Sequence, residues 1–269
     1  MSEKTVRVLS LGAGVQSSAL YLMYLRGDLP NPPAFAIFAD THAEPKAVYE
    51  WLDMLVRMSG ADPRIVIPIH RVSAGDIVAD TLGGARYASP PFFVMNPDGT
   101  SAAVRRQCTS EYKIAPILKG VRTLLGYKPR RRVRETVEMI LGMSLDEPHR
   151  LKRSQERWIK NVYPLAFEKP MRRHECEEYI RALGFGDAPR SACWMCPYRS
   201  DREWLHLKAT EPETFQKAVN FDQAIRKSHS LKGQNFVHRS MKPLADVDLD
   251  PLRDQIDLFG NECEGMCGA

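Results

Sequence analysis

The chain has 269 residues, of which 43% are hydrophobic and 26% are charged, as is ordinary for a soluble globular protein. No apolar run approaches the roughly 18 residues of a membrane span, and a predicted strand follows the first residues without a signal peptide. The net charge of +5 is mildly basic. We therefore expect a cytoplasmic protein with one large α/β domain, or a smaller domain with an appended module.

The N-terminal stretch has the order strand, glycine-rich turn and helix. A short buried strand leads into Gly12 and Gly14, and a helix is predicted over residues 19–26. Glycines let the backbone approach a phosphate closely, and a helix N-terminus adds partial positive charge. Ser17 and Ser18 add hydroxyl donors at that end. The stretch predicts a phosphate site, with a tight connection that binds nothing as the alternative.

The next residues continue the alternation of strands and helices. The apolar run 34–39 fits a strand covered on both faces, Pro45 suits a helix start, and residues 65–69 form the third predicted strand. This β-α-β-α-β order predicts a parallel sheet, in which ligands bind at the carboxyl ends of the strands. Asp40 is then expected beside the glycine-rich turn, unless it only caps the next helix.

A long segment separates this unit from the next helix. Residues 83–104 are rich in glycine, proline and serine, which predicts a functional or mobile loop. Phe92 and Phe93 are expected to anchor this loop, with covering a nucleotide as the alternative. Thr109 is predicted to cap the helix that carries Lys113. A thiol at such a helix start, beside arginines, favours the thiolate, which makes Cys108 a candidate reactive group.

The remaining pattern completes an α/β chain. Residues 136–143 and 162–167 read as the fourth and fifth strands, and residues 171–183 as a helix. We expect a parallel, doubly wound, Rossmann-like sheet of about five strands. It occupies residues 1–200, and residues 201–269 form a helical C-terminal extension that packs on the same domain and ends in a cysteine-containing tail.

Cysteines and clustered cations are the other notable features. A cytoplasmic setting favours metal or redox chemistry over disulfides, and the Cys-x-x-Cys spacing suits a metal, a cluster or a dithiol pair. The six cysteines are Cys108, Cys176, Cys193, Cys196, Cys263 and Cys267. The basic clusters lie at residues 128–134, 150–157 and 172–173. Such clusters attract phosphate-rich partners, including nucleic acid, or form a solvated face.

The glycine-rich turn and the Asp-Thr pair after the second predicted strand resemble motifs of the PAPS-reductase-like family. This family belongs to the ATP-pyrophosphatase superfamily, also called PP-loop or adenine nucleotide alpha hydrolases. Residues 12–17 align with the pattern Ser-Gly-Gly-x-Asp-Ser, with Gly12 in place of Ser, Ala13 in place of Gly and Gln16 in place of Asp. The Asp-Thr pair that follows the second strand resembles the second motif, with His42 in place of a glycine.

Three further segments follow in the family's order. Residues 108–116 resemble its Cys-x-x-x-x-Lys-x-x-Pro segment, with one cysteine where adenylylsulfate reductases have a pair. Residues 142–150 resemble the fourth-strand motif, which lines the nucleotide site, and residues 193–197 carry the Cys-x-x-Cys. Near the C-terminus, Glu262 and Cys263 echo the reductases' catalytic Glu-Cys segment, without the Leu-His that follows it.

The resemblance implies a set of site residues. Ser17, Lys113 and Cys263 are the implied catalytic residues. The residues implied to hold the nucleotide are Ser10, Gly12, Ala13, Gly14, Gln16, Ser17, Ser18, Asp40, Thr41, Gly142 and Arg150. The implied cofactors are ATP, Mg²⁺ on Asp146 or Glu147, and a [4Fe–4S] cluster on Cys108, Cys193 and Cys196 with Cys176 as a fourth ligand. A four-thiolate zinc site on the same cysteines is the alternative.

Three functions are compatible with these features. In the first, ATP adenylates an oxygen of tRNA or DNA, pyrophosphate leaves, and sulfur from a persulfide or cluster sulfide displaces AMP. Its partners would include a sulfur donor such as a cysteine desulfurase, and a homodimer is compatible with it. In the second, the chain is a PAPS or adenylylsulfate reductase in which Cys263 attacks sulfur. In the third, it is a non-catalytic nucleotide-binding module held together by zinc.

Overall fold

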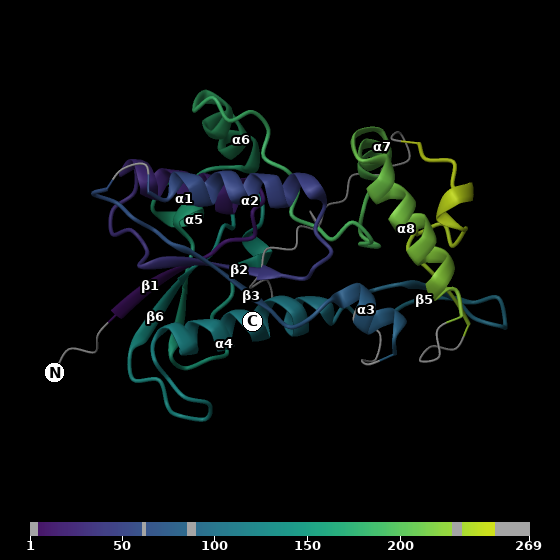
Figure 1. Ribbon diagram of the computed structural model, residues 1–269, viewed down its shortest axis with the longest axis horizontal. Helices are drawn as coiled ribbons and strands as arrows, with labels where there is room; N and C mark the ends of the chain where they lie inside the picture. The colour runs from purple at the N-terminus through teal and green to yellow at the C-terminus, as the bar shows by residue number, and fades with distance from the viewer. Residues whose placement is uncertain (1–4, 61–62, 85–89, 228–232, 251–269) are drawn as a thin grey trace.

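The computed structural model describes residues 5–60, 63–84, 90–227 and 233–250. One part is a three-layer α/β unit, in which helices cover both faces of a sheet (Figure 1). Its strands are β1 (Thr5–Ser10), β2 (Phe35–Asp40), β3 (Ile69–Ser73), β6 (Thr136–Ile140) and β7 (Ile159–Val162). Its helices are α1 (Val15–Arg26), α2 (Lys46–Met58), α5 (Pro164–Phe167) and α6 (Arg173–Ala182) above, and α4 (Ala115–Leu124) below.

All neighbouring strands of this sheet are parallel, in the order β3-β2-β1-β6-β7. The predicted parallel α/β fold of about five strands is therefore confirmed. Strand order reverses at β1, which pairs with β2 on one side and β6 on the other. The crevice at such a reversal, outside the carboxyl ends of the strands, is where open α/β sheets bind ligands. The segment that follows Ser10 lies at this crevice.

The bounds of three predicted strands were wrong, and the fourth, predicted over residues 136–143, ends at Ile140. The third begins only at the last residue of the predicted range 65–69, because Pro68 has no N–H to donate and contributes only its carbonyl, to Ala36 N at 2.8 Å. The fifth ends at Val162, where Pro164 starts the short helix α5. In the ranges predicted for the third and fifth strands, the apolar residues indicated neither pairing in the sheet nor uniform burial, since Val66 is 57% and Phe167 72% exposed.

A second core forms beside this unit. It is built from α3 (Ile77–Leu82), α7 (Asp201–Thr210), α8 (Pro212–Ile225) and a small antiparallel sheet in the order β5-β4-β8. These strands are β4 (Phe93–Met95), β5 (Ser101–Ala103) and β8 (Gln234–Phe236), and the 3₁₀ turn η3 (Leu244–Asp246) follows. The C-terminal extension, predicted to be helical, thus also contributes a strand.

The predicted irregular loop at residues 83–104 was therefore also wrong in part. It contains the β4–β5 hairpin, whose turn is closed by a hydrogen bond from Gly99 N to Asn96 O at 3.0 Å. The prediction for Phe92 is confirmed, because its ring is buried and its centroid lies 5.9 Å from that of Phe221 on α8. The hairpin joins the segment before Cys108 to the C-terminal helices.

The helix that carries Lys113 begins differently from the prediction. Residues 108–109 are already helical, and a π-helical segment, η1 (Ser110–Ile114), leads into α4. Thr109 has helical dihedral angles and makes no side-chain cap; its hydroxyl accepts a hydrogen bond from Arg106 Nε at 2.8 Å. Isolated π turns are frequent at functional sites. Within the described part of the chain, no helix has the length and hydropathy needed to cross a membrane.

Candidate nucleotide and thiol site

The glycine-rich turn ends in an uncapped helix. Helix α1 begins at Val15, four residues before the predicted start, so Ser17 and Ser18 lie in its first turn rather than in the loop. Gly14 is the N-cap and provides no side-chain acceptor for the first N–H groups of the helix. Such unpaired N–H groups, at the positive end of the helix dipole, form a ready site for a phosphate.

Two departures from the family pattern preserve its backbone geometry. Ala13 has φ 56° and His42 has φ 59°, both in the left-handed region that glycine adopts freely. At these two positions the chain has another residue where the pattern has glycine. Placing a residue other than glycine in this region costs about 1–2 kcal/mol of conformational free energy. Both turns therefore keep a left-handed backbone that is unfavourable for alanine and histidine. This geometry in the chain itself supports the resemblance.

Unpaired buried atoms flank the turn. Ser10 Oγ and Gln16 Oε1 are buried and have no hydrogen-bond partner among the described residues. Buried polar atoms are normally paired, so these two fit a ligand that carries donors or bound water. Ser17 Oγ accepts from Gly12 N at 3.2 Å and holds the turn closed. Ser18 Oγ instead accepts from Trp51 Nε1 at 2.9 Å, a structural contact with α2.

A carboxylate lies beside the position at which the loop lacks one. Gln16 Nε2 donates to Glu147 Oε2 at 3.2 Å, and Arg150 forms an ion pair with the other oxygen of Glu147. Glu147 and Arg150 lie at the 3₁₀ turn η2 (Pro148–Arg150), beyond the buried Gly142 at the end of β6. Asp146 accepts from Arg173 N at 2.6 Å at the start of α6. Both predicted Mg²⁺ ligands are thus engaged within the protein.

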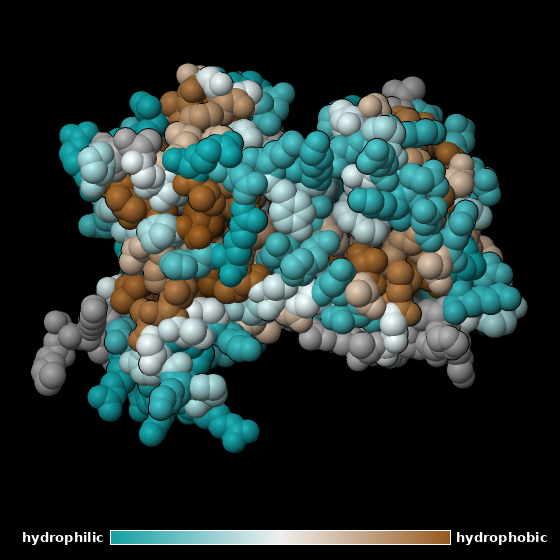
Figure 2. Space-filling model, viewed as in Figure 1, coloured by the Kyte–Doolittle hydropathy of each residue, from teal (hydrophilic) through white to brown (hydrophobic). Residues whose placement is uncertain are grey.

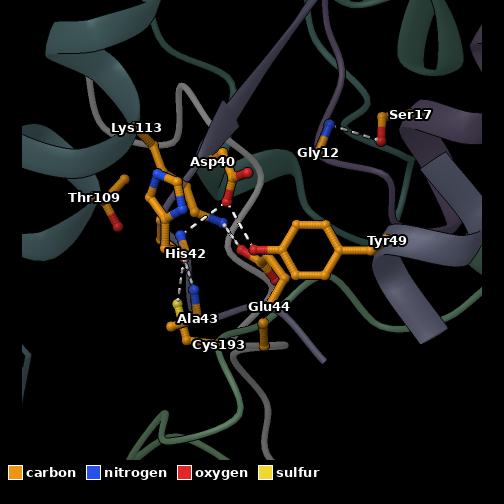
Figure 3. A network of polar contacts seen from close by, with 12 residues as sticks. Gly12, Ser17, Asp40, His42, Ala43, Glu44, Tyr49, Thr109, Lys113 and Cys193 are labelled. Carbon is orange, nitrogen blue, oxygen red and sulfur yellow. Dashed lines mark hydrogen bonds and ion pairs between the residues drawn. The ribbon is translucent and has the colours of Figure 1, made fainter. Parts of the chain in front are cut away.

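Asp40 is fixed at the end of β2, next to the turn. Its Oδ1 accepts from His42 N and from the Tyr49 hydroxyl, each at 2.8 Å (Figure 3). The N-cap of α2 is Pro45, so Asp40 does not cap that helix. Burial, together with the hydrogen bond to Asp40, raises the pKa of Tyr49, and the phenol therefore remains a donor. Asp40 keeps a second oxygen for a ligand or a solvent molecule.

The loop after β2 is joined directly to the Cys-x-x-Cys turn. Thr41 Oγ1 lies 3.3 Å from Cys193 Sγ, and Trp194 N donates to Ala43 O at 2.8 Å. The same loop carries Glu44, whose Oε1 is 3.3 Å from Lys113 Nζ. Figure 3 shows the thiol, this ion pair and Asp40 grouped together, with the Gly12–Ser17 contact nearby.

The ion pair between Glu44 and Lys113 is almost completely enclosed. The side chains are 0% and 5% exposed respectively, and Glu44 Oε2 has no hydrogen-bond partner among the described residues. Burial raises the pKa of the Cys193 thiol well above its ordinary value; Glu44 adds to this, whereas Lys113 and the Thr41 hydroxyl oppose it. Cys193 is therefore a protonated thiol at neutral pH.

Three of the four predicted metal ligands share a cavity. Cys108, Cys193 and Cys196 line one small pocket together with Arg106 and Tyr198, among other residues. Cys176 is buried on α6 in the core beneath α1, and the structure does not bring it to the other three.

The cysteines do not form the predicted centre as described. Across the described ranges, no group of three or more His, Cys, Asp or Glu side chains is arranged to bind a metal ion. The described residues therefore do not fit a preformed cluster or zinc site. Cys263 and Cys267 lie outside the described residues.

Sequence reasoning missed one buried cation at this site. Arg199 is 7% exposed, and burial lowers the pKa of its guanidinium. It donates to Ala192 O at 2.9 Å and to Cys193 O at 3.3 Å, which fixes the Cys-x-x-Cys turn from behind. The available signal was an arginine three residues after Cys196, directly after the apolar run 192–198.

Comparisons with known proteins gave distant structural matches and no sequence match. No protein-family model matches the chain, and no curated protein matches its sequence. Among solved structures, the chain is similar to phosphoadenylyl-sulfate (PAPS) reductase from Candida auris, crystallised as a phosphate complex. The two share 13% sequence identity with a TM-score of 0.36, over 69% of this chain and 75% of that one. At this distance, the case for the fold rests on the chain's own parallel sheet and strand order.

Proposed function

We propose that this chain is a nucleotide-utilising enzyme of the PAPS-reductase-like, PP-loop type that activates an oxygen of a nucleic acid with ATP and replaces it with sulfur. One observation carries this proposal. The loop after β2 begins at Asp40, beside the predicted phosphate site, and three residues later Ala43 O accepts a hydrogen bond from Trp194 N in the Cys-x-x-Cys turn. Nucleotide activation and thiol chemistry are thus supported by one segment of backbone.

The first step needs only the turn and its neighbours. The N–H groups at the start of α1 would bind phosphate oxygens of ATP, and Ser17 would keep the turn closed. The acceptor oxygen attacks the α-phosphorus, the bond to the β-phosphate breaks, and pyrophosphate leaves. When bound, Mg²⁺ would neutralise phosphate charge, but the protein's carboxylates do not present a ready site for it.

The second step uses the thiols. A persulfide formed on one cysteine of the Cys-x-x-Cys pair by a sulfur donor attacks the activated carbon through its outer sulfur, and AMP leaves. The second cysteine then attacks the inner sulfur, which releases the thiolated product and leaves a disulfide between Cys193 and Cys196. A dithiol reductant restores the pair. This spacing suits such a resolving step, since Cys196 N donates to Cys193 O at 3.0 Å in a tight turn.

Neighbouring serines provide a matched test of the first step. The assay measures AMP and pyrophosphate released from ATP in the presence of tRNA or duplex DNA and a persulfide donor. Ser17→Ala, which opens the turn, is expected to abolish release, whereas Ser18→Ala, which removes only the Trp51 contact, is expected to retain it. Cys193→Ser should still release pyrophosphate but give no thiolated product.

Two results would contradict the proposal. No pyrophosphate release with either nucleic acid would exclude ATP activation, and equal activity of the two serine variants would exclude the turn as the site. Sulfite production from PAPS that requires Cys263 would instead identify the reductase alternative. ATP binding without any turnover would identify a binding module.

A further inference from the structure

A large open cavity lies at the edge of the sheet opposite the proposed site. It has a volume of about 1270 Å³ and is bordered by Thr136, the first residue of β6, and by Trp158, directly before β7. The connection between α4 and β6 forms its outer wall, and it projects below the sheet in Figure 1. Figure 2 shows a hydrophilic projection at the same place. We refer to this cavity as the basic hollow.

The lining of the basic hollow is strongly cationic. Its six basic residues are Arg122, Lys128, Arg131, Arg132, Arg134 and Arg157, and its two acidic residues are Glu135 and Glu156. The acids are already engaged, Glu135 by the Tyr127 hydroxyl and Glu156 by Trp158 Nε1 at 2.8 Å. Five of the cations, all except Arg122, are exposed. Clustered exposed cations on one face attract a polyanion.

The form of the hollow favours an extended phosphate backbone over a small ligand. Its volume exceeds the roughly 300–1000 Å³ of typical small-molecule pockets. Its aromatic groups are occupied, because Arg122 lies over the Trp158 ring at 6.0 Å and the Tyr127 hydroxyl accepts from Arg134 N at 3.0 Å. What remains available is charge, which binds phosphates without reading bases.

We propose that the basic hollow is a docking surface for the phosphate backbone of nucleic acid, recognised without regard to sequence. This inference deepens the proposed function, from which it takes the nucleic-acid partner. The strand β6 has five residues, so the amino ends of the strands, where the hollow lies, are about 17 Å from their carboxyl ends, where the proposed site lies. One turn of a duplex is about 34 Å long, which suffices to reach from the hollow to the catalytic edge.

Binding can be measured without nucleotide or turnover. A fluorescein-labelled 24-base-pair duplex of random sequence is titrated with the full chain and followed by anisotropy between about 50 and 200 mM salt. The test variant is the triple Arg131→Gln, Arg132→Gln, Arg134→Gln. The control is the triple Arg57→Gln, Lys208→Gln, Lys217→Gln, which removes the same charge from exposed positions outside the hollow.

The expected result is at least tenfold weaker binding for the test triple and a salt slope smaller by about 2–3, since each lost phosphate contact removes about 0.9. The control triple should bind within about twofold of the unmodified chain. Equal losses in the two triples, or no binding at about 50 mM salt, would overturn the proposal. A phosphate-sized competitor, inorganic phosphate at 10 mM or so, should not displace the duplex; if it does, the hollow is a small-anion site.

The outcomes separate the two proposals. Pyrophosphate release that fails while duplex binding depends on the hollow would reject the catalytic assignment alone. Turnover that persists while both triples bind equally would reject the docking surface alone.

Discussion

Replacing Lys113 tests whether the enclosed ion pair supports the site. Lys113→Met keeps the length of the side chain but removes its charge, and it leaves Glu44 as an uncompensated carboxylate that is 0% exposed. Breaking a buried pair in this way costs about 3–5 kcal/mol. Because Glu44 Oε2 already lacks a partner among the described residues, we expect a cost at the upper end of that range.

A double-mutant cycle isolates the pair from general packing. Glu44→Leu should be destabilising like Lys113→Met, whereas the double variant should recover most of the loss, because two apolar side chains of similar volume replace the pair at little cost. Stability is measured by urea unfolding. A loss below about 1 kcal/mol for Lys113→Met, or additive losses in the double variant, would show that the pair is not buried as the structure has it.

Burial is the main cause of the raised pKa of the neighbouring thiol, Cys193, and the same ion pair modulates that pKa. Glu44 raises and Lys113 lowers the pKa of Cys193. Alkylation of Cys193 at pH 8 or so, followed by mass spectrometry, should therefore be faster in Glu44→Gln than in the unmodified chain, and slower in Lys113→Met. If Lys113→Met folds poorly, the comparison of the Cys193 alkylation rate between Glu44→Gln and the unmodified chain is sufficient for the test. The opposite order would refute an electrostatic link between the ion pair and the thiol.

Three further predictions concern stability. Gly233→Ala should cost more than Gly99→Ala by about 1 kcal/mol or more in urea unfolding: both glycines have positive φ (93° and 83°), but only at Gly233 would a Cβ lie 2.4 Å from a carbonyl oxygen. Burial lowers the pKa of His238, so its contribution to stability is present above the ordinary histidine pKa of about 6.5 and is lost as pH falls below it. His238→Gln should flatten the dependence of the melting temperature on pH there. Ser18→Ala should lower stability by about 1–3 kcal/mol because Trp51 Nε1 loses its acceptor, and no change would show that the indole finds another.

Local sequence patterns predicted the order of strands and helices in the parallel sheet. The apolar run that became β2 is buried at every position up to Asp40, as expected of a central parallel strand. The glycine-rich turn and the helix after it lie where the alternation placed them, although helix propensity alone did not reveal that α1 starts at Val15. Ile67 and Leu165 were wrongly predicted to lie in strands. Both side chains are buried, and over a few residues a buried loop or short helix has the same apolar pattern as a strand.

The contacts that complete the site could not be predicted from local patterns. Glu44 and Lys113 are 69 residues apart, and Thr41 and Cys193 are 152 apart. Each pairing depends on how the second core packs against the sheet, which no periodicity describes. The cysteine set shows the same limit: residue type grouped Cys176 with the others, but the structure places it in a different core.

The departures from the family pattern are compensated locally, which favours a retained site over a decayed one. Ala13 and His42 keep the left-handed backbone that glycine would give, against a steric cost. The carboxylate missing at Gln16 is supplied 3.2 Å away by Glu147, a residue 131 positions later. If the site had lost its function, the strained backbone at Ala13 and the unpaired hydroxyl of the buried Ser10 would each be free to disappear by mutation. Folding alone requires neither of them. We therefore expect the chain to show the proposed nucleotide binding, and Gln16→Asp should weaken it, because two carboxylates would then face each other without the amide between them.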